Sequence, residues 1–195
     1  MESQPKLGKP GAGLPLIEGL VARFYFYPSS MRRFSWDGSL RQMRDEAERI
    51  AALVAPLTEE QFQKPVLIDR LIGLEDSSRF WSAAMTIEHL MIVIRGMAAA
   101  ALELASGRPY EMTFGTAAVK PQGRNLPPRD ALVADFRRLT EETAAALAPL
   151  GAAASGRYKA KHPFFGMIPA QGWVFVLGAH QKLHRVQIER IIKGL

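Results

Sequence analysis

The segment from residue 173 to residue 193 restricts the fold most, because its apolar residues repeat at helical spacing. It reads WVFVLGAHQKLHRVQIERIIK. Steps of three and four residues keep side chains on one face of an α-helix. One such stripe holds Trp173, Leu177, His180, His184, Gln187 and Ile191. The charged residues fall on the opposite face, so the pattern predicts a final helix that buries two histidines one turn apart.

Three earlier segments share this periodicity, and none of the chain shows a convincing strand pattern. The first opens at Ser39, with Gln42 three residues on as in a capping box, and Pro56 ends it. The second is apolar almost all round, and Pro149 and Gly151 stop the third. The sequence therefore predicts an all-α four-helix bundle with helices at residues 39–54, 82–105, 129–148 and 173–193, and with loops at 64–80 and 151–171.

Residues 106–128 form an unusually long connection rich in glycine and proline. Antiparallel neighbours in a bundle need only about 2–8 linking residues. A helix of roughly 24 residues is about 36 Å long, and this connection could span that length in extended form. We therefore expect a crossover that makes the second and third helices parallel, in up-down-down-up order.

The chain of 195 residues suits one domain, residues 35–195, preceded by an extension over residues 1–34. The Pro/Gly/Lys-rich start predicts a partly disordered arm. Residues 14–27 are apolar and end in Phe-Tyr-Phe-Tyr, which favours packing on the bundle or on a partner. No signal peptide is expected, and the apolar stretch 90–102 contains Arg95 and is too short to cross a bilayer, so we expect no membrane partner.

The chain lacks cysteine, which excludes a thiolate nucleophile and leaves histidine and carboxylates as strong metal ligands. This composition fits a cytoplasmic location. The net charge is +6, but the basic residues are scattered and no nucleic-acid-binding motif is present, so we expect no nucleic-acid partner. The positive excess favours a small anionic substrate.

The chain has four histidines, and His89, His180 and His184 all fall on faces predicted to point inward. Two interpretations stay open for them. They are either core histidines, each bonded to a neighbour, or a site where three imidazoles bind a divalent ion and leave positions open for water or substrate. Such an ion lowers the pKa of bound water and polarises a carbonyl.

Several short motifs, taken in order, carry a resemblance to a known family: Trp-Ser at 81–82, Glu-His-Leu at 88–90, HPFFG at 162–166, Gly-Trp at 172–173 and HQKLHRVQI at 180–188. Together they resemble the DinB/YfiT-like superfamily over about residues 39–193. The resemblance implies a four-helix bundle in up-down-down-up order, often a homodimer. It also implies a zinc, nickel or iron ion bound by His89, His180 and His184.

Other residues are candidates for the surroundings of this site. Gln187 follows His184 by one turn and is expected to hold that histidine or to contact substrate. Trp81 and Trp173 are expected in the core or the pocket wall, and His162 is expected to fix its own loop. Glu75, Asp76 and Glu88 are the candidates for a general acid or base. Alternatively, Glu75 or Asp76 caps the second helix, and Glu88 is a solvated surface residue.

Two functions are compatible with these features. The first is a metal-dependent transferase or hydrolase that acts on a small substrate. The resemblance includes transferases that use low-molecular-weight thiols, and a coordinating thiol is deprotonated by its metal, which would supply the nucleophile that the chain lacks. The second is a non-catalytic binding or dimerisation protein with a structural or vestigial metal site.

Overall fold

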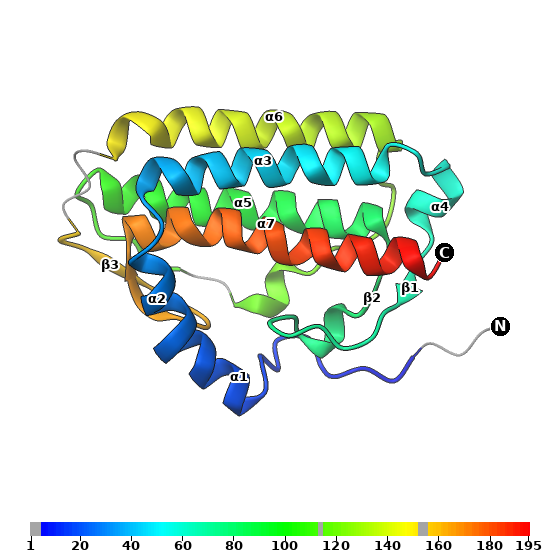
Figure 1. Ribbon diagram of the computed structural model, residues 1–195, viewed down its shortest axis with the longest axis horizontal. Helices are drawn as coiled ribbons and strands as arrows, with labels where there is room; N and C mark the ends of the chain where they lie inside the picture. Colours follow the sequence, from blue (N-terminus) through cyan, green and yellow to red (C-terminus); the bar gives the residue numbers. More distant parts are fainter. Residues whose placement is uncertain (1–4, 113–114, 152–155) are drawn as a thin grey trace.

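The computed structural model describes residues 5–112, 115–151 and 156–195, and most of them are helical. Four long helices lie side by side (Figure 1). They pack in the pairs α3–α7, α5–α7, α5–α6 and α3–α6, so that each helix has two neighbours around a common core. These helices are α3 (Trp36–Val54), α5 (Ala83–Ala105), α6 (Arg129–Leu147) and α7 (Ala170–Lys193). The prediction of an all-α protein is confirmed.

The predicted start of the first long helix at Ser39 was wrong by three residues. Ser35 is the N-cap of α3, and its Oγ accepts from the amide of Gly38 at 3.1 Å. Ser39 is fully buried inside the helix. The added turn begins with Trp36, whose indole packs in the core and donates to the carbonyl of Leu147 at 3.1 Å. Tertiary burial of this aromatic residue decides where the helix begins.

Ser82 caps α5, and its Oγ accepts from the amide of Met85 at 3.0 Å. The alternative that Glu75 or Asp76 caps this helix was therefore wrong. The capping box at Thr58 is present, and it opens the short helix α4 (Glu59–Gln63).

The segments predicted as loops contain short strands and 3-10 turns. Val66–Leu67 (β1) pairs antiparallel with Phe80–Trp81 (β2). Lys159–His162 (β3) pairs antiparallel with Gly166–Pro169 (β4), with Lys159 opposite Pro169 and His162 opposite Gly166. The turn between them needs a φ of +76° at Gly166, which glycine adopts readily. Single 3-10 turns occur at Asp76–Ser78 (η2), Thr116–Val119 (η3) and Ala148–Leu150 (η4).

The N-terminal extension forms a continuous helical segment from residue 16 to residue 31. It comprises α1 (Leu16–Val21), the π-helical turn η1 (Ala22–Phe26) and α2 (Tyr27–Met31). Pro28 has no amide hydrogen for the carbonyl of Phe24, which accounts for the irregular turn just before it. Tyr27 stacks on Phe165, with ring centroids 5.3 Å apart, and packs against Gly172 at the start of α7.

Helix α5 is the most apolar element. With 23 residues and a mean hydropathy of 1.4 over its most apolar window, it is the one helix in the described part of the chain that could cross a membrane by length and composition. However, 61% of that window is buried inside the protein, as in the central helix of a packed core. Its burial places His89 deep between helices.

Candidate metal centre

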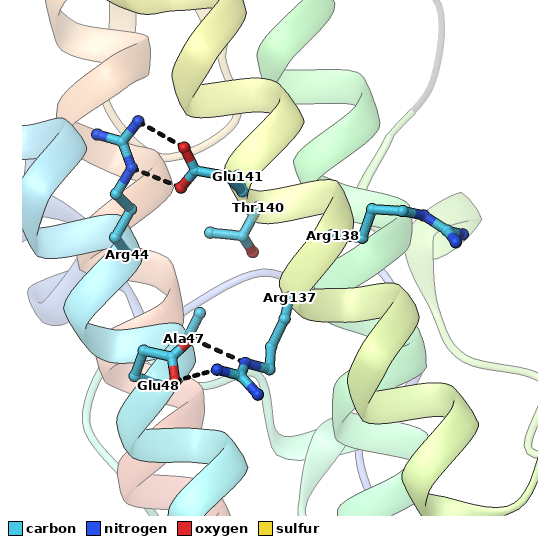
Figure 2. A pocket seen from close by; sticks show the side chains of 7 residues that line it. All are labelled: Arg44, Ala47, Glu48, Arg137, Arg138, Thr140 and Glu141. Carbon is cyan, nitrogen blue, oxygen red and sulfur yellow. Dashed lines mark hydrogen bonds and ion pairs between the residues drawn. The ribbon is translucent and has the colours of Figure 1, made fainter.

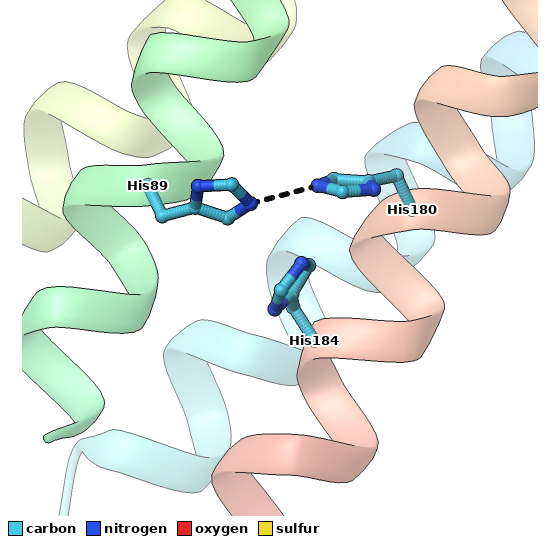
Figure 3. A group of neighbouring side chains, drawn as sticks. All are labelled: His89, His180 and His184. Atoms are coloured by element: carbon cyan, nitrogen blue, oxygen red, sulfur yellow. Dashed lines mark hydrogen bonds between the residues drawn. The ribbon is translucent and has the colours of Figure 1, made fainter. Parts of the chain in front are cut away.

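Three histidines from two helices converge in the middle of the bundle. His89 projects from α5, and His180 and His184 project from successive turns of α7 (Figure 3). One nitrogen from each ring lies within 4.8 Å of the other two. His89 and His184 are buried, with 6% and 2% of their surface exposed, and His180 is half-buried. The expected convergence of these rings is what the structure has.

Two of the imidazoles are held in a fixed orientation by their Nδ1 atoms. Nδ1 of His89 lies 2.7 Å from the carbonyl of Val119, which can only accept, so this nitrogen carries the proton. Nδ1 of His184 lies 2.6 Å from Oε1 of Gln187. Gln187 is itself oriented, because its amide nitrogen donates to the carbonyl of Ser78 at 2.7 Å. Both Nε2 atoms are therefore unprotonated and present a lone pair.

The third imidazole, that of His180, is the one whose proton can move between its two nitrogens. Nε2 of His180 lies 3.1 Å from Nε2 of His89. Since the His89 nitrogen has no proton to give, His180 must donate in this contact. A cation between the rings would take the place of that proton, and His180 would then carry its hydrogen on Nδ1. The donor set of three neutral imidazoles fits zinc, nickel or iron.

The electrostatics of the cluster favour uncharged rings. Burial lowers the pKa of His89 to about 4. Burial, followed by the charge of neighbouring histidines, lowers the pKa of His180 and His184 well below the ordinary value. All three are therefore neutral near pH 7, which is the form that binds a metal ion. Burial also makes protonation of all three rings unfavourable. A single cation bound by three neutral rings is the less costly way to place positive charge in this cluster.

Trp81 and Lys120 border the histidine cluster. The Trp81 ring lies nearly parallel to His184 at 6.1 Å between centroids, and 5.0 Å from the ring of His89. Trp81 thus forms a wall of the site, as expected for a pocket or core residue. Nζ of Lys120 lies 5.3 Å from the Trp81 ring, and its charge contributes to the lowered pKa of His89. A cationic side chain therefore stands beside the cluster.

Glu75 joins three segments near this cluster. Its carboxylate lies 3.0 Å from Nζ of Lys120 and accepts from the hydroxyl of Thr116 and from the amides of Gly11 and Gly13. Burial raises the pKa of Glu75, but Lys120 and these hydrogen bonds outweigh it, and the pKa is lower than usual. An ionised, fully bonded Glu75 holds the N-terminal arm and the crossover against η2.

The two other acidic candidates also make structural contacts. Asp76 pairs with Arg79 at 2.8 Å and accepts from the amide of Gly8. Glu88 is half-buried and accepts from the amide of Gly123 at 2.9 Å, which ties the crossover to α5.

His162 and Trp173 form a separate group at the β3–β4 turn. Nδ1 of His162 accepts from the amides of Phe164 and Phe165, and its ring stacks on Phe165 at 4.7 Å. Trp173 lies fully buried beside it, 5.2 Å between ring centroids. Neither residue belongs to the three-histidine cluster, and the bonds of His162 fix its own turn. Burial lowers the pKa of His162 to about 3.

Three groups near the histidines could not be predicted from the sequence. The partners of His89 and Gln187 are the backbone carbonyls of Val119 and Ser78, and carbonyls have no sequence signature. Lys120 is one of many scattered lysines and arginines. Only the length of the crossover and its glycine and proline residues indicated that this segment returns along the bundle.

The surface recess between α3 and α6 is a weaker candidate for a binding site. It has a volume of about 330 Å³, and two ion pairs cross it from helix to helix, while Arg138 pairs with Asp135 on its own helix (Figure 2). Arg44 makes a two-pronged ion pair with Glu141, and Arg137 makes one with Glu48. Because these charges are already satisfied, the recess offers no group that needs a ligand.

Comparison with known proteins places this arrangement in a family. The family model described as the DinB superfamily matches residues 40–188, which excludes the N-terminal extension and includes all three clustered histidines. No curated protein and no solved structure matches the chain. The match covers most of the chain and every long helix, so the protein belongs to the DinB superfamily.

Proposed function

We propose that this protein is a divalent-metal-dependent enzyme whose metal is bound by His89, His180 and His184. The observation that carries the proposal is the convergence of three neutral imidazoles, two of which are held with Nε2 free. An ion bound there would supply Lewis-acid chemistry, by polarising a substrate carbonyl or by lowering the pKa of a coordinated thiol or water.

We propose a small substrate, and a transferase or hydrolase reaction. The chain has no cysteine, so a thiol nucleophile would come from a low-molecular-weight thiol. Lys120 lies beside Trp81 and supports an anionic substrate group: its ammonium pairs with Glu75 and also bonds to the hydroxyls of Ser77 and Ser78, and an anion could replace these two hydroxyls as partners. Trp81 would exclude water from one side of the centre.

The up-down-down-up order belongs to this proposal too. It is supported by the colours in Figure 1, in which α3 and α7 progress from left to right and α5 and α6 progress from right to left. In that order, the helices that carry the three ligands are antiparallel neighbours. Their packing keeps His89 level with His180 and His184.

A structural or vestigial metal site in a non-catalytic binding protein is the second candidate. One observation favours it: His89 and His184 are almost entirely buried, and the recess between α3 and α6 borders no histidine. A metal without an open coordination position would hold α5 and α7 together and do no chemistry.

Metal analysis of protein purified without a histidine tag tests the proposal. We expect about one equivalent of a transition metal per chain, lost in His184→Ala and retained in His162→Asn, since His162 lies outside the cluster. Equal metal content in wild type and His184→Ala would contradict the proposed ligands.

Cobalt substitution then separates the two candidates. A low-molecular-weight thiol that enters an open position changes the visible spectrum of the bound cobalt, which favours the enzyme. A spectrum that no added thiol or water-displacing anion changes favours the structural site.

A further inference from the structure

The helical segment at residues 16–31 has its apolar face turned toward solvent. Two adjacent rows at four-residue spacing, Leu16, Leu20 and Phe24 in one and Ile17, Val21 and Tyr25 in the other, are 48–78% exposed. In the described part of the chain, the exposed large apolar residues elsewhere, Leu67, Ile72 and Met167, are scattered. Single exposed apolar residues are ordinary, but a contiguous group of this kind marks an interaction surface.

The opposite side of this segment attaches it to the protein. Glu18 forms an ion pair with Arg70 and accepts from the amide of Gly73. Farther along, Phe26 packs on Phe175, with ring centroids 6.0 Å apart. The ion pair of Glu18 and the packing of Phe26, which is still 45% exposed, lie inward, and the aliphatic and aromatic rows lie outward. The helix is thus held in place with its apolar face unpartnered. Figure 1 shows α1 standing off from the four long helices.

The segments that adjoin this face are rich in basic residues. Residues 14–34 pack on the β3–β4 hairpin through Tyr27 and Phe165, and the Arg23 side chain lies against Gly166 at the hairpin turn. Residues 14–34 and 156–169 together contain six lysines or arginines and one acidic residue, Glu18, which is already paired. On the outer side of the hairpin, Lys161 is paired with exposed Met167.

We propose that the face formed by residues 16, 17, 20, 21, 24 and 25 docks on an anionic phospholipid surface. Helices that lie in a membrane interface combine an aliphatic and aromatic face with flanking basic residues, and they bury the apolar side chains about 5–10 Å deep. A second copy fits less well, because a two-fold symmetric contact would bring the two basic surroundings together. The prediction of no membrane partner was made from the sequence, which does not show that these two rows of side chains point outward.

Vesicle sedimentation with the full chain tests this proposal. We expect the wild-type protein to sediment with vesicles that contain phosphatidylglycerol and to stay in solution with pure phosphatidylcholine, with binding that weakens as salt is added. The double variant Leu20→Ser, Phe24→Ser should lose more than about tenfold in affinity, because two bulky apolar side chains no longer enter the interface.

Leu67→Ser is the matched control, since Leu67 is as exposed as Leu20, at 48%, but lies in β1, which Figure 1 shows apart from α1. It should bind vesicles as the wild type does. The altered side chains are all exposed, so circular dichroism should confirm that the variants fold. The proposal is overturned if the wild type ignores anionic vesicles, or if the double variant binds them unchanged. A wild-type dimer that the double variant dissociates, with no vesicle binding, would also overturn it and assign the face to a second copy.

Discussion

Gln187 is the side chain that sets the orientation of His184. Its Oε1 accepts from Nδ1 of His184 at 2.6 Å, and its amide nitrogen is anchored on the carbonyl of Ser78. Partners of this kind fix the tautomer of a metal-binding histidine, and their loss costs about 10–100-fold in metal affinity. We therefore expect Gln187→Leu to weaken zinc binding by about that factor, as measured by competition with a chelator of known affinity.

Gln181 offers a matched control on the same helix. It is as fully buried as Gln187, but its contact is a long hydrogen bond to Thr140 of α6 at 3.5 Å and not a bond to a histidine. Its Oε1 has no partner. Gln181→Leu should leave zinc affinity unchanged. If both leucine variants weaken zinc binding equally, the effect comes from packing of α7 and not from the bond to His184.

The crossover between α5 and α6 is linked to the N-terminal arm by one carboxylate, that of Glu75. Glu75 holds Thr116 and Lys120 of the crossover and the amides of Gly11 and Gly13 in the arm. We expect Glu75→Ala to loosen both segments together, because half-buried Lys120 loses its charge partner. Hydrogen exchange should then speed up at residues 8–13 and 116–120 and stay unchanged in α3 and α6.

Asp76→Ala is the control variant for Glu75→Ala. Asp76 bonds the arm through the amide of Gly8 and pairs with Arg79, and it makes no contact with the crossover in the part of the chain that the structure describes. Exchange should therefore rise in the arm alone. Faster exchange in the crossover of this variant as well would show that the arm, and not Glu75, holds the crossover in place.

Helical spacing made much of this arrangement predictable. A spacing of four put His180 and His184 on one face, and the apolar surroundings of His89 put it inside, so the three rings were expected to meet. The start of α3 was not predictable in the same way, because burial of Trp36 overrides the local capping signal at Ser39. The β3–β4 hairpin was missed because four residues with alternating burial are too short for a period to stand out.

At the scale of the whole molecule, the sequence could not show which way the extension faces. The apolar composition of residues 14–27 indicated a contact with the bundle or a partner. Composition does not distinguish a face that packs inward from one that points outward, since both need the same residues. That choice depends on contacts distant in sequence, such as Glu18 with Arg70 and Phe26 with Phe175.

Acid stability is a property of the whole molecule to which His162 contributes. Burial lowers its pKa to about 3 from an ordinary value of 6.5, so the unfolded chain takes up a proton that the folded chain excludes. This contribution is fully present above pH 6.5 and is lost as the pH falls toward 3, by about 2 kcal/mol between pH 7 and pH 5. Asparagine can accept the same turn amides without titrating, so we expect His162→Asn to lose less stability over that interval, by about 2 kcal/mol in urea unfolding. If the wild type and His162→Asn lose the same free energy of unfolding between pH 7 and pH 5, His162 titrates alike in the folded and unfolded chains.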